Sequence, residues 1–208
     1  MVAIDCRLAF NTFGNPDAQI LEINSKSGLY PLYAAYSLYR TKLGGKEESV
    51  YLPEDLMKVW DEAVAQIYVL CQTPMAMDIT NRTLVGYRSV STNVKYDKKL
   101  LGKLKDSIEK TAKEICKGFY WGKEVKEMKF DAVVGNPPYQ EETAQRQSTT
   151  NGQSPRKNIF QHFQLVADVI ATGVMCSSAT SDRPASTAPE SRTSTRNRWA
   201  CSREPFWF

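Results

Sequence analysis

The hydrophobic positions in the first part of the chain change from a strand-like to a helix-like pattern. Residues 18–24, Ala-Gln-Ile-Leu-Glu-Ile-Asn, alternate as a half-buried strand does. A short polar loop follows, and residues 29–40 are then spaced as a helix with Pro31 in its first turn, where proline is tolerated. A strand, a loop of small residues and a helix form the opening unit of a dinucleotide-type α/β fold.

The middle of the chain continues with both patterns. Residues 54–66 predict an amphipathic helix, and the continuous apolar run 67–71 predicts a buried strand. Further short strands are expected over 83–87 and 93–94. Residues 97–117 carry a long stripe of apolar positions at helical spacing, so we expect a single helix there that ends at a glycine.

Two groups of aromatic residues admit either a packing role or a ligand role. They are Tyr30, Tyr33 and Tyr36 in the first predicted helix, and Phe119, Tyr120 and Trp121 before the next strand. Aromatic rings at helical spacing usually pack in a core, although exposed rings also stack on bases. We expect core packing for the first group, and packing under the following strand for the second.

Residues 130–139, Phe-Asp-Ala-Val-Val-Gly-Asn-Pro-Pro-Tyr, combine a short apolar strand with a stiff turn. Pro137 and Pro138 fix the backbone and remove two donors, so neither sheet nor helix continues. The side-chain oxygen of Asn136 and the carbonyl of Pro137 accept hydrogen bonds, and Tyr139 offers a ring for stacking. Such a turn is suited to holding a planar group that carries an amino nitrogen.

This stretch resembles the catalytic motif of the DNA adenine-N6 methyltransferases of restriction-modification systems. The resemblance rests on Asn136-Pro137-Pro138-Tyr139 and on the preceding Phe-Asp-x-Val-Val-Gly. It implies that a flipped adenine is methylated by S-adenosyl-L-methionine. Asn136 and the Pro137 carbonyl would bind the N6 amine, and Tyr139 would stack on the base. The alternative is a Pro-Pro turn with a purely structural role.

The first strand, loop and helix resemble the cofactor motif of the same family, an apolar strand followed by Asp-Pro-x-x-Gly-x-Gly. Glu22 takes the place of the Asp, Ile23 of the Pro, Lys26 of the first Gly and Gly28 of the second. The resemblance implies that Glu22, Asn24 and Gly28 hold S-adenosyl-L-methionine. The alternative is an ordinary strand, turn and helix without a ligand.

A second acid of the cofactor site is expected in residues 75–80, which follow the second predicted strand and are expected to line the site. Asp78 is the candidate in this segment. The alternative is a solvated or capping aspartate.

Composition restricts the function classes. A chain of 208 residues with 42% hydrophobic and 24% charged residues is an ordinary globular protein. The net charge of +4 permits contact with nucleic acid without predicting it. No apolar run is long enough to span a membrane and no signal peptide is present, so we expect a cytoplasmic protein. Five cysteines without a Cys-x-x-Cys pair, and one histidine, predict neither a zinc site nor a disulfide framework.

The pattern changes near the C-terminus. A helix capped by Asn158 is expected, with Phe160, Phe163, Val166, Ala167 and Ile170 on its apolar face. From Gly173 onward Ser, Thr, Ala, Arg and Pro dominate without a period. We therefore expect a partial methyltransferase catalytic domain over 1–172 and an irregular tail over 173–208, which is either disordered or the product of a frame shift near Thr172.

These patterns predict an α/β, Rossmann-like S-adenosyl-L-methionine-dependent methyltransferase fold, incomplete at its C-terminus, with helices on both faces of the sheet. The expected activity is site-specific adenine-N6 methylation of double-stranded DNA, with a restriction nuclease or specificity module as a candidate partner. Two alternatives stay open. One is a methyltransferase that acts on protein glutamine or RNA, because the same tetrapeptide serves those enzymes. The other is an inactive truncated remnant or a binding subunit.

Overall fold

The computed structural model describes residues 12–135 and 159–177, and these contain one parallel β-sheet. Its strands are β1 (Ile20–Ser25), β2 (Ile67–Cys71), β3 (Asn93–Tyr96), β4 (Phe130–Gly135) and β5 (Ala171–Ser177). They are arranged in the order β3-β2-β1-β4-β5. The chain therefore builds outward in one direction from β1 and then reverses to add β4 and β5. This is the doubly wound arrangement of a Rossmann-like fold, as predicted.

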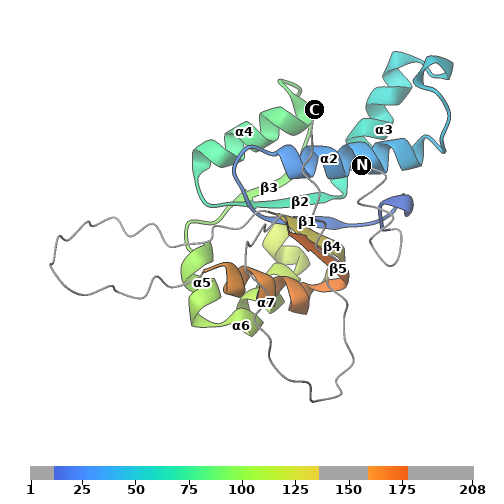
Figure 1. Ribbon diagram of the computed structural model, residues 1–208. Coiled ribbons are helices and arrows are strands. Elements are labelled where there is room, and N and C mark those ends of the chain that lie inside the picture. The colour runs from blue at the N-terminus through green and yellow to red at the C-terminus, as the bar shows by residue number, and fades with distance from the viewer. Residues whose placement is uncertain (1–11, 136–158, 178–208) are drawn as a thin grey trace, which may run out of the picture.

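Helices cover both faces of the sheet (Figure 1). One layer consists of α2 (Leu29–Lys42), α3 (Pro53–Ala65) and α4 (Pro74–Val85), and the other of α5 (Leu100–Asp106), α6 (Ile108–Ile115) and α7 (Phe160–Ile170). Short 3-10 helices are η1 (Thr12–Gly14), η2 (Glu48–Val50) and η3 (Gly118–Trp121). Neighbouring strand residues face opposite layers, so Ile20 belongs to the first core and Leu21 to the second. Both faces of each central strand must therefore be apolar.

The segment after β2 is helix α4 as far as Val85, so the strand predicted over 83–87 was wrong. Residues 75–80, which the sequence predicted to line the site, lie on this helix. The side chain of Thr73 accepts a hydrogen bond from the Ala76 N–H at 3.1 Å, and Pro74 occupies the first turn. Thr-Pro is thus the start signal of α4 rather than a mere end of β2.

The single helix predicted over 97–117 is divided into α5 and α6 at Ser107. Ser107 has an extended backbone, and its side-chain oxygen accepts a hydrogen bond from the Lys110 N–H at 3.4 Å. A serine that caps a new helix competes with continuation of the old one. The apolar stripe continues across the break, and for that reason the spacing alone predicted one helix. The second helix ends at Ile115, before the glycine expected to end it.

The packing prediction for Tyr30, Tyr33 and Tyr36 was wrong, because these side chains are 37%, 45% and 41% exposed. The face of α2 that meets the sheet carries smaller residues, including Ala34 and Ala35. Small residues let the helix backbone approach the sheet closely.

The second aromatic group is divided. Phe119 is 90% exposed, so its predicted packing was wrong. The ring of Trp121 packs edge-on against Tyr68 and Phe130, with centroids 5.1 and 6.2 Å apart. Tyr120 packs in turn against Trp121.

The last strand crosses the predicted end of the ordered domain. Strand β5 runs from Ala171 to Ser177 and pairs with β4 as far as Gly135, so it spans residue 172, where the sequence analysis expects the domain to end. Helix α7 has the predicted apolar face, with Phe163, Val166 and Ala167 buried. Asn158 and the tail over 178–208 lie outside the described residues.

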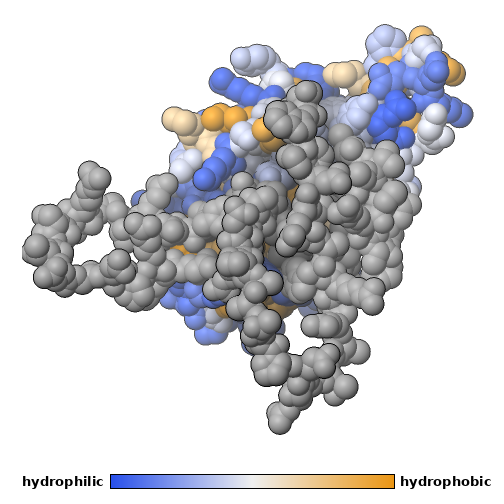
Figure 2. All heavy atoms as spheres, viewed as in Figure 1, coloured by the Kyte–Doolittle hydropathy of each residue, from blue (hydrophilic) through white to orange (hydrophobic). Residues whose placement is uncertain are grey.

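The outer surface mixes polar and apolar side chains. Hydrophobic residues are visible over α4 (Figure 2), where Met75 and Ile79 are 71% and 42% exposed. Within the described ranges, every helix is too short or too polar to cross a lipid bilayer.

Two glycines test the packing of the second layer. A Cβ atom on Gly118 would lie 1.8 Å from the carbonyl oxygen of Val125, whereas a Cβ on Gly102, within α5, would meet nothing within 4 Å. We expect Gly118→Ala to lower the free energy of unfolding by about 2–4 kcal/mol, because the backbone must shift. Gly102→Ala should instead raise it by up to about 1 kcal/mol. Urea unfolding measures both, and equal midpoints for the two variants would contradict this packing.

Candidate functional site

The carboxyl ends of β1 and β4 meet where the strand order reverses. Glu22 pairs with Val134 in parallel register. A Cβ atom on the next residue, Gly135, would lie 3.1 Å from the carbonyl oxygen of Ile23 and 3.8 Å from Cγ of Glu22. A side chain at this position would require the end of β4 and β1 to move apart by a few tenths of an ångström, and glycine avoids that contact. Open α/β sheets bind their ligands at such a point.

The predicted catalytic residues begin directly at this point. Asn136 is the first residue after β4, which ends at Gly135. The side chains of Asn136, Pro137, Pro138 and Tyr139 themselves lie outside the described residues. The structure therefore places Gly135, the residue before the motif, and the roles of the motif's side chains stay a prediction.

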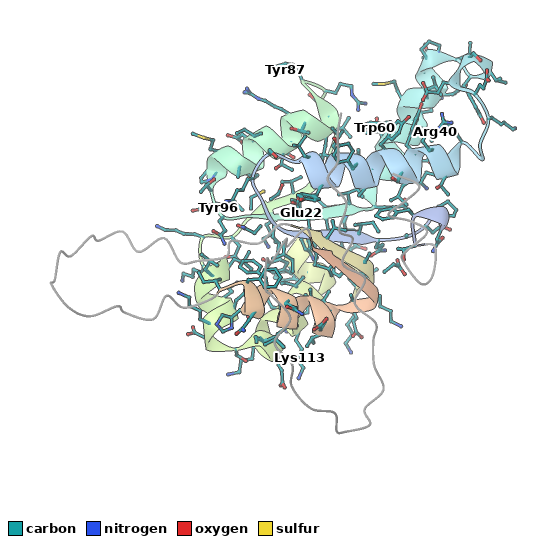
Figure 3. All side chains as sticks on the ribbon, viewed as in Figure 1. Glu22, Arg40, Trp60, Tyr87, Tyr96 and Lys113 are labelled. Carbon is teal, nitrogen blue, oxygen red and sulfur yellow. The ribbon has the colours of Figure 1, made fainter. Side chains whose placement is uncertain are left out.

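Glu22 is a buried acid within β1. Its side chain is 3% exposed, and Oε2 has no hydrogen-bond partner in the described part of the chain. Figure 3 shows Glu22 at the sheet, on the side that α2 covers. Burial raises the pKa of Glu22 to about 7, against a smaller lowering by a hydrogen bond with Ser25. An unpaired carboxylate at such a place is costly, and a ligand that donates a hydrogen bond would remove that cost.

Asn24 is the extra residue of a β-bulge. Strand register passes from Ile23 opposite Leu70 directly to Ser25 opposite Cys71. Asn24 has φ of 72°, a left-handed conformation that asparagine tolerates better than most residues. It is 4% exposed, and its amide nitrogen has no partner among the described residues. Bulges of this kind re-aim side chains beside functional sites.

Gly28 caps the start of α2 with φ of 76°. Its N–H donates to the hydroxyl of Ser25 at 3.2 Å, which closes the loop between β1 and α2. A Cβ here would lie 3.0 Å from Cα of Thr80. Lys26, which stands where the resembled motif has a glycine, is exposed. The loop therefore keeps its tight form although one glycine of the motif is missing.

Asp78 is not brought together with these residues. It is exposed on α4, several residues after the end of β2. The residue that directly follows β2 is Gln72, whose Nε2 is buried without a partner in the described ranges. Dinucleotide folds place the residue that contacts the ribose near this position. Gln72 is not among the predicted cofactor residues, because an acid was expected after the second strand. The end of the apolar run at Cys71 was the available signal.

Asp97, directly after β3, differs from Glu22 because its carboxylate is fully engaged by side chains of the protein. Its carboxylate accepts hydrogen bonds from Lys103 at 2.9 Å and from Tyr120 at 3.0 Å. Burial opposes ionisation of Asp97, but the hydrogen bonds from Lys103 and Tyr120 outweigh it, so the pKa lies below its usual value. This acid ties β3 to α5 and η3 and has its partners within the protein. Within the described ranges, no three His, Cys, Asp or Glu side chains gather closely enough to hold a metal ion.

The fold and these side chains define a Rossmann-like α/β protein with buried polar side chains at the point where its strand order reverses. Buried donor and acceptor atoms without partners lie beside the loop over Ser25–Gly28, here called the glycine loop. This combination fits a ligand with both hydroxyl and charged groups. A family model described as Eco57I restriction-modification methylase matches residues 65–177, more than half of the chain. The chain belongs to this family.

The match extends from just before β2 to the end of β5 and includes Asn136–Tyr139, whereas Glu22–Gly28 precede it. A comparison with curated proteins finds no match. The family confirms the predicted restriction-modification methyltransferase class, with DNA as the class of substrate.

The buried Glu22 generates a pH-dependent prediction. Its pKa rises from the usual 4.5 to about 7 on folding, so the folded state binds more protons than the unfolded chain between these values. Wild-type stability should therefore fall as the pH rises through this window. Glu22→Gln removes the titration, and its free energy of unfolding relative to the wild type should increase by about 2–4 kcal/mol between pH 4.5 and pH 8.

Urea unfolding of the ligand-free proteins at both pH values measures this difference. Asp78→Asn is the matched control, since that carboxylate is exposed, and its stability relative to the wild type should not change in this way. Parallel pH profiles for the wild type and Glu22→Gln would contradict the burial of Glu22.

Proposed function

We propose that this protein transfers a methyl group from S-adenosyl-L-methionine to N6 of an adenine in double-stranded DNA. The observation that carries the proposal is the end of β4 at Gly135, directly before the Asn-Pro-Pro-Tyr motif in the sequence. Gly135 lies against β1, the strand that holds Glu22. The strand that leads into a motif suited to an amino group and the buried polar side chain of Glu22 therefore meet in the sheet. Membership of a restriction-modification methylase family supports DNA as the substrate.

The cofactor site of this proposal consists of Glu22, Asn24, Gln72 and the loop ending at Gly28. Glu22 Oε2 accepts a hydrogen bond, and the amide nitrogens of Asn24 and Gln72 donate. S-adenosyl-L-methionine carries ribose hydroxyls, an ammonium and a carboxylate, so it matches both kinds of atom. When bound, it supplies an electrophilic methyl group on sulfur. Of the predicted cofactor residues, Asp78 lies outside this group.

The substrate side of the proposal rests on the motif. The Asn136 side-chain oxygen and the Pro137 carbonyl accept the two hydrogens of the adenine amine, which fixes its orientation. Pro138 keeps the turn stiff, and Tyr139 stacks on the flipped base. Rate acceleration then comes from holding the amine in line with the methyl group and away from water. A restriction nuclease or a specificity module is the partner that we propose for such a methylase.

The alternatives make different predictions. A glutamine methyltransferase would hold an amide through the same turn, and the family match favours DNA over that substrate. A non-catalytic remnant would keep the fold without binding the cofactor, and the exposed lysine in the glycine loop is the residue that motivates it.

The test compares wild type with Asn136→Ala. We expect both to bind S-adenosyl-L-methionine with dissociation constants within about threefold of each other, while methyl transfer to duplex DNA falls at least about 100-fold in the variant. The loss arises because the amine is no longer oriented. Calorimetry measures binding, and transfer of a labelled methyl group to duplexes with and without adenine measures activity.

Asn15→Ala is the control, because Asn15 lies in a turn before β1, at the other end of the strand. Its transfer rate should equal that of the wild type. Equal transfer by Asn136→Ala would contradict the assigned role. Wild type that binds no cofactor would indicate a remnant, and label on a glutamine peptide instead of DNA would identify the other substrate.

A further inference from the structure

Helix α4 contacts the glycine loop through two threonines on one face. Thr80 and Thr83 are three residues apart, a spacing that places side chains on the same side of a helix. The hydroxyl of Thr80 lies 3.3 Å from that of Ser25. The hydroxyl of Thr83 lies 3.0 Å from the carbonyl oxygen of Ser27 and 2.9 Å from that of Ile79 in its own helix, and these two acceptors share its one hydrogen. The contacts with Ser25 and Ser27 join residues more than fifty positions apart in sequence.

The contact of Thr80 belongs to a buried chain of hydrogen bonds. Thr80 is 0% exposed and Ser25 is 2% exposed. The thiol of Cys71 donates to the Thr80 oxygen at 3.9 Å, and the Gly28 N–H donates to the Ser25 oxygen at 3.2 Å. If Thr80 donates to Ser25, the hydroxyl hydrogen of Ser25 goes to Glu22, with which it shares a hydrogen bond. This order uses each hydrogen once and ends on the carboxylate of the cofactor site.

The bulge at Asn24 makes this chain possible. Side chains along a strand alternate between faces, so without the extra residue Ser25 would face the opposite helix layer from Glu22. With it, Ser25 stands opposite Cys71 and meets Thr80 of α4. The left-handed backbone of Asn24 costs about 1–2 kcal/mol. The hydrogen bonds that Ser25 makes with Thr80 and Gly28 offset this cost.

Helix α4 also limits where the loop can lie. A Cβ on Gly28 would be 3.0 Å from Cα of Thr80 and 3.1 Å from Cβ of Thr83. The loop backbone therefore rests directly on the helix, with no space to move toward it. Packing against α4 holds the loop from one side, and the hydrogen bond from the Gly28 N–H to the Ser25 hydroxyl closes it.

We propose that Thr80 and Thr83 are positioning residues of the cofactor site. They fix the loop over Ser25–Gly28 so that Glu22 and Asn24 present their partnerless polar atoms to the cofactor. Both threonines act through the two serines of the loop. This assignment rests on the proposed function, because it requires that the loop bind S-adenosyl-L-methionine.

The test replaces the Thr80 hydroxyl by a methyl group of similar size. We expect Thr80→Val to weaken binding of S-adenosyl-L-methionine about tenfold, because Ser25 loses one buried hydrogen-bond partner and the loop is no longer fixed. Thr80→Ser keeps the hydroxyl and should bind within about threefold of the wild type. Calorimetry on the full chain measures both, and amide exchange of Gly28 in the ligand-free protein should be faster in Thr80→Val only.

Thr111→Val is the matched control. Thr111 is a buried threonine of α6, in the other helix layer, and its hydroxyl donates to the carbonyl oxygens of Lys103 and Ser107 at 2.9 and 2.8 Å. This variant should lose stability in urea but keep wild-type affinity. Thr83→Val concerns a less buried residue. It tests the same loop, with an expected loss of about threefold, should Thr80→Val not fold.

The outcomes distinguish failure of the positioning role from failure of the proposed function. Wild-type affinity in a folded Thr80→Val, or an equal loss in Thr111→Val, would overturn the positioning role and leave the proposed function intact. Absence of binding by the wild type would overturn the proposed function, and the positioning role with it. Loss in Thr80→Val, rescue by Thr80→Ser and no loss in Thr111→Val support the assignment.

Discussion

The parallel pairing of β1 with β4 is the constraint on which the site depends. It brings Gly135 beside Glu22 and so close to Ile23 that a Cβ atom on residue 135 would lie 3.1 Å from the Ile23 carbonyl oxygen. β4 lies on the other side of β1 from β2, so the strand order reverses at β1, and helices cover both faces of the sheet (Figure 1). Ligands of open α/β sheets bind at the carboxyl ends of the strands where the order reverses.

The polar atoms at this edge are held at a cost to folding. Glu22 is buried with an acceptor unpaired, and Asn24 combines an unpaired donor with left-handed backbone. Asp97, one strand further out, has its partners within the protein. Natural proteins usually satisfy buried polar groups, and exceptions gather where a ligand completes them. The contrast between these acids supports the proposed binding role of Glu22 and a structural role for Asp97.

The sequence predicted the fold because its apolar runs are unambiguous at the centre of the sheet. Residues 67–71 form β2 as expected, and the valines before Gly135 belong to β4. The predictions failed where two different structures would give the same spacing of apolar residues along the sequence. Helix α2 has apolar residues around most of its circumference, so spacing could not tell that Ala34 rather than Tyr33 faces the sheet. The break at Ser107 was hidden because the apolar stripe continues through it.

A residue of the candidate site could be predicted from the sequence only where both its type and its position matched the motif that the chain resembles. Glu22 and Gly28 follow from strand, loop and helix in order. Gln72 did not, because an amide stands where a carboxylate was sought. Thr80 has no signal in sequence, since its role depends on a contact with Ser25 across 55 positions. Such a contact exists only once α4 is packed against β1.

Hydrogen exchange with and without S-adenosyl-L-methionine tests the central claim that the cofactor binds at the carboxyl ends of β1 and β2. The account predicts added protection in peptides covering 22–28 and 72–80. It predicts none in residues 122–125 and 127–129, which line an open hollow together with Asp17 and Gln19, just before β1. Protection confined to that hollow, or spread evenly over the chain, would contradict it.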